Sequence, residues 1–177
     1  EITPADIVDG EVRAPAKEVR FSADDQKRVA GITVEIGDIV VSIKGAVGIV
    51  GKVGVDALIC AVMEQPWVIS QSLAVIRHRK NNFIATPNVL AAILTAPWVR
   101  ERLANLSGGS VVNTLPISAL RSLKIPVPEA TEIDRIKGEL EQIEAMRTEI
   151  LALQRNLDER QTDLWEQLWN MKSVDKI

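Results

Sequence analysis

The sequence is poor in the residues that most often carry catalysis, bind metals or stack on bases. It has no tyrosine, two phenylalanines, four tryptophans, one histidine and one cysteine among 177 residues. A single cysteine excludes a disulfide within the chain and is consistent with a reducing, cytoplasmic location. One cysteine and one histidine are also too few for a zinc site. The few aromatic residues, mostly in apolar or helical contexts, disfavour an aromatic platform for single-stranded bases.

Motifs for nucleotide chemistry and membrane insertion are missing as well. The glycine-rich segment 44–54 does not fit a P-loop, because Gly45 to Gly51 is one residue too long and Val53 stands where a hydroxyl must bind magnesium. No run of 18 apolar residues occurs, so we expect no membrane span. The sequence therefore predicts a binding protein without catalytic residues, metal or cofactor. An enzyme that uses Cys60 or His78 remains an alternative.

Charge is distributed unevenly along the chain, although the net charge is only −3. Residues 39–128 contain nine basic and three acidic residues, a local charge of +6. Residues 1–38 carry −4, from five basic and nine acidic residues, and residues 129–177 carry −5, from seven basic and twelve acidic residues. Because the local field decides what a surface attracts, the middle segment is the candidate for binding a polyanion.

The first 128 residues have mixed β and α patterns. Turn residues in segment 1–38 predict short strands and loops, and apolar runs predict further strands at 38–43, 47–53, 57–63, 67–69, 73–77 and 123–127. Thr86-Pro87 is typical of a capped helix start, and Pro97 restarts the helix, which predicts a helical hairpin. Residues 116–120 predict one more helical turn. The glycines of segment 44–54 are interpreted as a tight hairpin, and equally as a loop whose backbone a ligand can approach closely.

Residues suited to a polyanion cluster at two places in this segment. Cationic side chains that suit phosphates are Lys44, Arg77, Arg79 and Lys80. Polar side chains that suit base edges or sugars are Asn81, Asn82, Ser110, Asn113 and Thr114, and Gly45 and Gly109 lie beside them in the sequence. A solvated polar turn at residues 77–82 is an equally good interpretation.

The last quarter of the chain predicts one long amphipathic helix. Apolar residues recur at mostly three- and four-residue steps: Ile133, Ile136, Leu140, Ile143, Met146, Ile150, Leu153, Leu157, Leu164 and Leu168. Thr131 and Asp134 predict a capping box at its start. At 1.5 Å per residue the helix is about 60 Å long, too long to bury its stripe on a domain of this size. We therefore expect it to pair with a second helix as a coiled coil; packing along its own domain is the alternative.

Several segments then occur in the order seen in a known family. They are Gly37-Asp-Ile-Val-Val-Ser-Ile-Lys-Gly-Ala-Val-Gly48, Ile69-Ser-Gln-Ser-Leu-Ala-Val-Ile-Arg77, Leu94-Thr-Ala-Pro-Trp98, Gly108-Gly-Ser110 and Leu115-Pro-Ile-Ser-Ala-Leu-Arg-Ser-Leu-Lys-Ile-Pro-Val-Pro128, followed by the long helix. With this order, nearly the whole chain resembles a target-recognition domain and its following helix from the specificity subunit of type I restriction–modification enzymes. One departure is Glu132-Ile133, where family members usually carry Glu-Gln.

The resemblance implies an α+β fold: a small β-rich recognition domain with a helical hairpin at 1–128, followed by a spacer or dimerisation helix at 129–177. It implies a non-catalytic subunit that reads one half of a bipartite site in double-stranded DNA. The long helix would carry modification (methyltransferase) subunits that hold S-adenosylmethionine, and restriction subunits that use ATP and Mg²⁺ would join them. The chain would be half of a longer subunit or a half-length form that pairs with itself. A coiled-coil adaptor that joins proteins without binding DNA is the alternative from another class.

Overall fold

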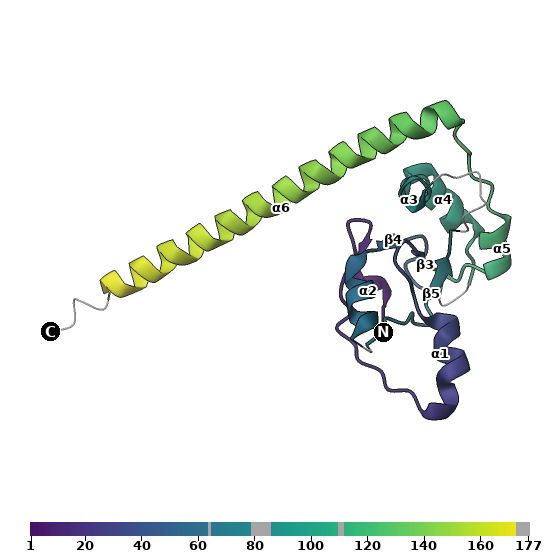
Figure 1. Cartoon of the computed structure of the whole chain (residues 1–177), viewed down its shortest axis with the longest axis horizontal. Helices are drawn as coiled ribbons and strands as arrows, with labels where there is room; N and C mark the ends of the chain where they lie inside the picture. The colour runs from purple at the N-terminus through teal and green to yellow at the C-terminus, as the bar shows by residue number, and fades with distance from the viewer. Residues whose placement is uncertain (64, 79–85, 110–111, 173–177) are drawn as a thin grey trace. The chain divides into compact units, whose positions relative to one another are not determined.

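The computed structural model describes residues 1–63, 65–78, 86–109 and 112–172. The chain divides into two compact units, Glu1–Ile133 and Asp134–Ile177. The first contains a five-stranded sheet with helices, and the second is a long helix, so the predicted α+β class with a long terminal helix is confirmed (Figure 1). None of the described helices combines the length and apolar content of a membrane span.

The sheet is mixed, with strand order β1-β2-β4-β3-β5. The strands are β1 (Ile7–Val8), β2 (Glu11–Val12), β3 (Ile39–Ser42), β4 (Val50–Val53) and β5 (Leu73–Ile76). Only the pairing of β2 with β4 is parallel, and β3 pairs antiparallel with both β4 and β5. Interior strand β3 is buried along its whole length, because both faces of the sheet are covered.

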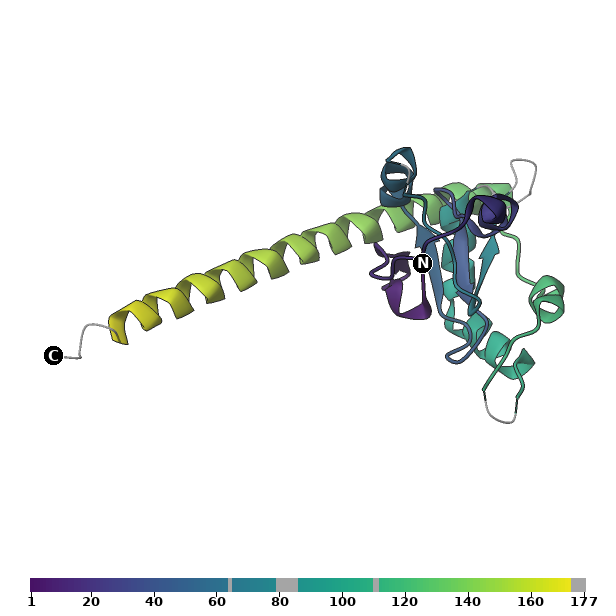
Figure 2. The ribbon, with the colours of Figure 1, turned by 90° about the horizontal axis from the view of Figure 1, so that it is seen from below.

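Alternate residues of β3 enter two hydrophobic cores. Ile39 and Val41 pack in the first core with residues of helices α3 (Pro87–Thr95) and α4 (Pro97–Leu106). Val40 packs in the second core with Trp67 and with Ala57 of helix α2 (Val55–Val62). The two-residue side-chain period of a strand accounts for this division. Figure 2 shows the strands from a second direction.

Helices α3 and α4 form the predicted hairpin. Thr86 caps α3 by accepting a hydrogen bond from the Val89 N–H at 3.3 Å, and Pro87 follows at the first helical position. Pro97 likewise occupies the first helical position of α4, which has no side-chain cap. The predicted turn of helix after Pro116 is α5 (Ile117–Ser122).

Two predicted strands are wrong, and the predicted strand 67–69 forms only isolated bridges, from Val68 to Thr33 and from Ile69 to Ile2. Segment 57–63 lies mostly within helix α2, whose Ala57 is buried and whose Leu58, Ile59 and Val62 are exposed; a short apolar run does not distinguish a buried strand from a helix. Segment 123–127 pairs with no strand in the described structure. Proline at 126 supplies no N–H for a ladder, and another proline follows at 128.

The first 38 residues contain more helix than the sequence predicted. Short 3-10 helices occur at η1 (Pro4–Asp6) and η2 (Ala23–Asp25), and α1 (Gln26–Ile32) was not anticipated. A turn at Asp9-Gly10 connects β1 with β2, and both residues have positive φ, 52° and 81°.

Helix α6 (Ala130–Lys172) is uninterrupted over 43 residues, about 65 Å at 1.5 Å per residue. Its predicted capping box is wrong, because Thr131 already lies inside the helix. The Glu129 N–H instead donates to the Glu132 carboxylate at 3.3 Å. This is the capping-box bond from a backbone N–H to the side chain three residues on, and it begins at Glu129, two residues before the predicted Thr131.

Candidate nucleic-acid interface

The turn between β3 and β4 is held in shape from inside the sheet. The buried hydroxyl of Ser42 donates to the Ala46 carbonyl and accepts from the Ile49 N–H at 2.8 Å. Gly45 and Gly48 have φ values of +75° and +85°, which glycine adopts at little cost. The segment 44–48 is therefore a compact, defined turn, and its Lys44 is exposed.

A loop from a distant part of the sequence pairs with this turn. The Gly45 N–H donates to the Asn113 carbonyl at 2.9 Å, and the Leu115 N–H donates to the Ile43 carbonyl at 2.8 Å. Lys44 and Thr114 form an antiparallel bridge between these two bonds. The structure thus brings together four of the residues that the sequence assigned to a polyanion surface: Lys44, Gly45, Asn113 and Thr114.

The loop has its own constraint at Gly109. Gly108 and Thr114 exchange backbone hydrogen bonds at 3.1 and 2.9 Å, which closes the loop at its base. A Cβ on Gly109 would lie 2.2 Å from the Val112 carbonyl oxygen, and the φ of Gly109 is +147°. Only glycine fits here, so Gly109 shapes the loop that presents Asn113, whose side chain is exposed.

Arg100 of α4 joins this surface, although the sequence analysis only counted it among the basic residues. A Cβ on Gly48 would lie 3.6 Å from Arg100 Cγ and 3.7 Å from its carbonyl oxygen. Arg100 and Lys44 are both exposed, and neither forms an ion pair with a described residue. Two cations without an ion pair to any described residue therefore lie at the turn. Nothing in the sequence relates α4 to the turn, because that contact depends on tertiary packing.

Arg77 lies elsewhere. It follows the end of β5 that pairs with Ile39 and so lies level with Asp38, whereas Lys44 is six residues further along the β3 direction, about 20 Å away at 3.3 Å per residue. Its guanidinium binds Asp38 through Nε at 2.8 Å and Nη2 at 2.7 Å, and Glu35 through Nη1 at 2.8 Å. Hydrogen bonding to Asp38 raises the pKa of the Arg77 guanidinium above its usual value. Arg77 thus neutralises a buried carboxylate.

The remaining predicted polar residues, Arg79, Lys80, Asn81, Asn82 and Ser110, lie outside the described residues. Their assignment stays a prediction.

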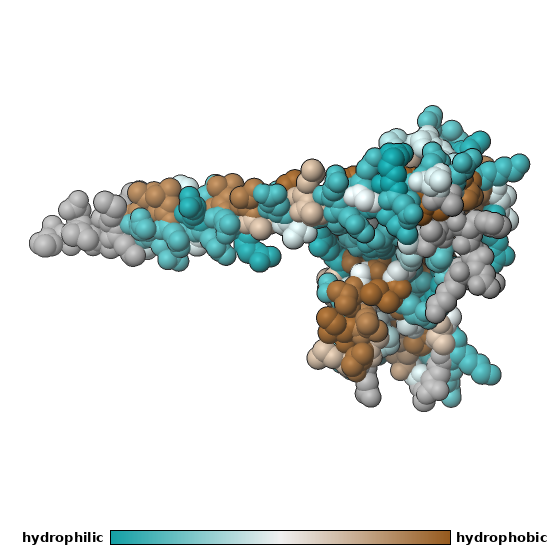
Figure 3. All heavy atoms as spheres, turned by 45° about the horizontal axis from the view of Figure 1, so that its top comes forward, coloured by the Kyte–Doolittle hydropathy of each residue, from teal (hydrophilic) through white to brown (hydrophobic). Residues whose placement is uncertain are grey.

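Helix α6 carries the predicted apolar stripe. Ile136 and Leu140 are half-buried, and the members further along are exposed: Ile143, Met146, Ile150, Leu153, Leu157, Leu164 and Leu168. Figure 3 shows apolar side chains along one side of the helix and polar ones beside them. Trp165 and Trp169 add 68% and 77% exposed indoles near its end. Such a contiguous exposed apolar surface is typical of an interaction site.

Ion pairs support the polar side of α6. Lys137 pairs with Asp134 at 3.5 Å and Arg147 with Glu144 at 4.0 Å, both at a spacing of three residues. Arg135 pairs with Glu139, four residues further along the helix.

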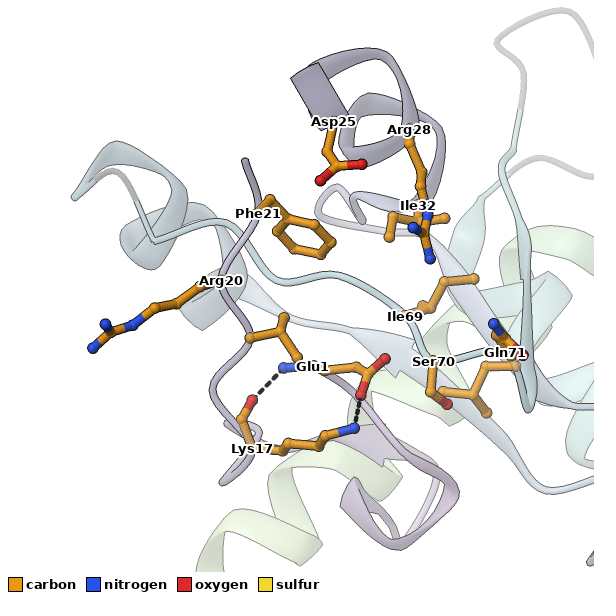
Figure 4. Close-up of a pocket in the computed structure, with 12 residues that line it drawn as sticks. Glu1, Lys17, Arg20, Phe21, Asp25, Arg28, Ile32, Ile69, Ser70 and Gln71 are labelled. Carbon is orange, nitrogen blue, oxygen red and sulfur yellow. Dashed lines mark hydrogen bonds and ion pairs between the residues drawn. The ribbon is translucent and has the colours of Figure 1, made fainter. Parts of the chain in front are cut away.

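The first unit also contains a cavity of about 540 Å³ that the sequence analysis did not anticipate. It is lined by Glu1, Lys17, Val19, Arg20, Phe21, Asp25, Arg28, Ile32, Ile69, Ser70, Gln71 and Leu73. In Figure 4 the Phe21 ring and the Arg28 guanidinium face the same space, and Arg20 points away from it. Its lining is spread over segments 1–32 and 69–73, and no sequence motif links the two.

No protein-family model matches the chain. A search of curated proteins likewise gives no match.

Proposed function

We propose that this chain is a non-catalytic DNA-recognition module of the type I specificity-subunit kind. The observation that carries the proposal is the joining of Lys44 and Gly45 with Asn113 and Thr114 by backbone pairing, with Arg100 beside the turn. Cations at such a surface suit phosphates, and the amide of Asn113 and the hydroxyl of Thr114 suit base edges. Segment 39–128, which contains all of these residues, carries the chain's excess of positive charge.

In this proposal helix α6 pairs two modules and binds partner subunits. An exposed apolar stripe on a helix of 43 residues suits pairing with another long helix, from a second recognition half or a second copy of this chain. Two such modules paired by their helices would hold two DNA-reading surfaces at a fixed separation, which suits a bipartite site. Modification subunits, with S-adenosylmethionine, would dock on the helix, and restriction subunits would join them.

A salt titration of duplex-DNA binding tests the proposal. The protein, alone and with modification subunits, is titrated against labelled mixed-sequence duplex from 50 to 300 mM salt. We expect log affinity to fall linearly with log salt concentration, because bound cations displace counterions from phosphates. Absence of salt-dependent binding under both conditions would contradict DNA recognition. A coiled-coil adaptor would pair through α6 in the same experiment without binding DNA.

A further inference from the structure

The cavity beside the sheet combines an aromatic face with a cation that lacks a strong partner. Ile32, Ile69 and Leu73 supply apolar walls, and Phe21 presents its ring to the interior (Figure 4). Arg28 forms no hydrogen bond or ion pair within 4 Å with any described residue; its interaction with Asp25 is a longer-range attraction. The volume of the cavity lies within the usual range of small-molecule sites, about 300–1,000 Å³.

The two carboxylates and the lysine of the cavity wall already form ion pairs or hydrogen bonds within the protein. Lys17 pairs with Glu1. Asp25 accepts hydrogen bonds from the Ser22 hydroxyl at 2.7 Å and from the Ser22 N–H at 3.2 Å, which lower the pKa of its carboxyl. Arg28 is thus the charge that the cavity offers to a ligand, and Gln71 also lines the cavity. A ligand that fits these groups has an anionic end and a flat apolar part.

The cavity adjoins the candidate nucleic-acid interface. Gln71 of its wall precedes Ser72, whose carbonyl accepts a hydrogen bond from the Ile43 N–H at 2.8 Å, and Lys44 follows Ile43 directly. Ser42 pairs with the cavity-lining Leu73, and residues two apart on an extended chain project to the same side. Lys44 and Leu73 are therefore expected on one face of the sheet, so a chain of phosphates bound at Lys44 would lie close to the cavity.

We infer that the cavity binds a nucleotide, with the base stacked on Phe21, the phosphate at Arg28 and the Gln71 amide at a base edge. The choice of ligand rests on the proposed DNA-binding function. Two sources share this chemistry: a free mononucleotide, or an unpaired nucleotide of the strand held at Lys44. One aromatic ring is sufficient to stack one base. Such a site differs from a platform of several aromatic side chains for successive bases, which the low aromatic content disfavours.

The first arm of the test uses thymidine 5′-monophosphate, with inorganic phosphate for comparison, in titrations of the ¹⁵N-labelled full chain. We expect the mononucleotide to shift the amide signals of residues 21, 28 and 71, and phosphate alone to bind at least about tenfold more weakly because it does not stack. Phe21→Leu and Arg28→Gln should each weaken mononucleotide binding at least about fivefold. Lys27→Gln is the matched control, since Lys27 lies next to Arg28 on α1, is exposed and does not line the cavity.

The second arm compares a fully paired duplex with one that carries a single bulged thymine. If the strand is the source, the bulged duplex binds at least about fivefold more tightly, and Phe21→Leu abolishes the preference. If the source is a free nucleotide, the two duplexes bind equally while the mononucleotide still binds in the cavity. The inference is overturned if the mononucleotide fails to shift the cavity signals and the bulge gives no preference.

The two proposals fail separately. Salt-dependent binding of paired duplex without any cavity signal removes the inference and leaves the proposed function. Mononucleotide binding in a protein that binds no duplex removes the proposed function and leaves a free-nucleotide site. Thermal melting of Phe21→Leu and Arg28→Gln, compared with the parent, confirms that each variant is folded.

Discussion

Arg77 donates to both carboxylate oxygens of Asp38, although 39 residues separate them in the sequence. Asp38 is 2% exposed, and its second oxygen also accepts from the Glu35 N–H at 2.8 Å. The Arg77 side chain is 45% exposed. A buried carboxylate thus has its countercharge at the surface, where the pair fixes the start of β3 to the end of β5.

Removal of this cation should destabilise the fold. Arg77→Ala leaves the Asp38 charge without its cation, and we expect a loss of about 2–3 kcal/mol in the free energy of unfolding, below the full cost of breaking a buried pair because Arg77 is partly solvated. Urea denaturation of both proteins measures this difference in the free energy of unfolding. Glu35→Gln, at a 65% exposed side chain, is the control and should change stability by no more than about 0.5 kcal/mol. Equal stability of Arg77→Ala and the parent would contradict the structural role.

Two glycines should respond in opposite directions to alanine. A Cβ on Gly51 would lie 2.7 Å from Ile7 Cγ2 and 3.1 Å from Val12 Cγ2, so Gly51→Ala should cost about 1–3 kcal/mol through overpacking. A Cβ on Gly31 in α1 meets no atom within 4 Å, so Gly31→Ala should stabilise by up to about 1 kcal/mol. Differential scanning calorimetry compares the melting temperatures. A higher melting temperature of Gly51→Ala than of the parent would contradict the close packing of Gly51 against Ile7 and Val12, and a lower one of Gly31→Ala would contradict the open space at Gly31.

Cations at the β3–β4 turn should contribute to DNA affinity regardless of sequence. Lys44→Ala and Arg100→Ala should each weaken binding of every duplex and lower the slope of log affinity against log salt by about 0.9 per lost phosphate contact. The sequence predicts the same for Arg79→Ala. Fluorescence anisotropy at several salt concentrations measures both quantities, with Lys27→Gln as a control. Unchanged affinity and slope in Lys44→Ala and Arg100→Ala would remove the turn from the interface.

Pairing through α6 should depend on the apolar stripe. Leu153→Asp places a charge among side chains that pairing would bury, and we expect the association constant to fall more than about 100-fold, equivalent to about 3 kcal/mol. Gln154→Asp, one residue along and also exposed, should leave association nearly unchanged. Sedimentation velocity across a concentration series gives both constants. Equal constants for the two variants would show that the stripe is not the pairing surface.

Local patterns were sufficient to predict much of the fold. The repeated three- and four-residue spacing of apolar residues in α6, the Thr86-Pro87 start of α3 and the apolar Ile39–Val41 run of β3 are all local signals. Helix α2 was misread because its apolar residues form a continuous run, whereas its burial, with Ala57 inward and Leu58 outward, depends on the sheet beneath it.

The candidate site was predictable only in its chemistry. Residue type marked Lys44, Asn113 and Thr114 as suited to a polyanion, but their pairing follows from backbone hydrogen bonds between segments about 70 residues apart. Arg77 has the same charge as Lys44, but the structure shows that it forms an ion pair with Asp38, which the sequence does not indicate. Composition therefore identifies candidate residues, and tertiary contacts decide which of them belong to the candidate surface and which have a structural role.

Selection from a random-sequence duplex library tests the account most directly. The full chain, at a concentration where it is paired, is used to capture 30-base-pair duplexes at about 150 mM salt over several rounds. The account predicts enrichment of one short motif in two copies at a fixed separation, with the motif lost in a protein changed at Asn113 and Thr114, and the paired arrangement lost in Leu153→Asp. A library that stays random after selection, although the protein is folded and paired, would contradict sequence-specific DNA recognition by this chain.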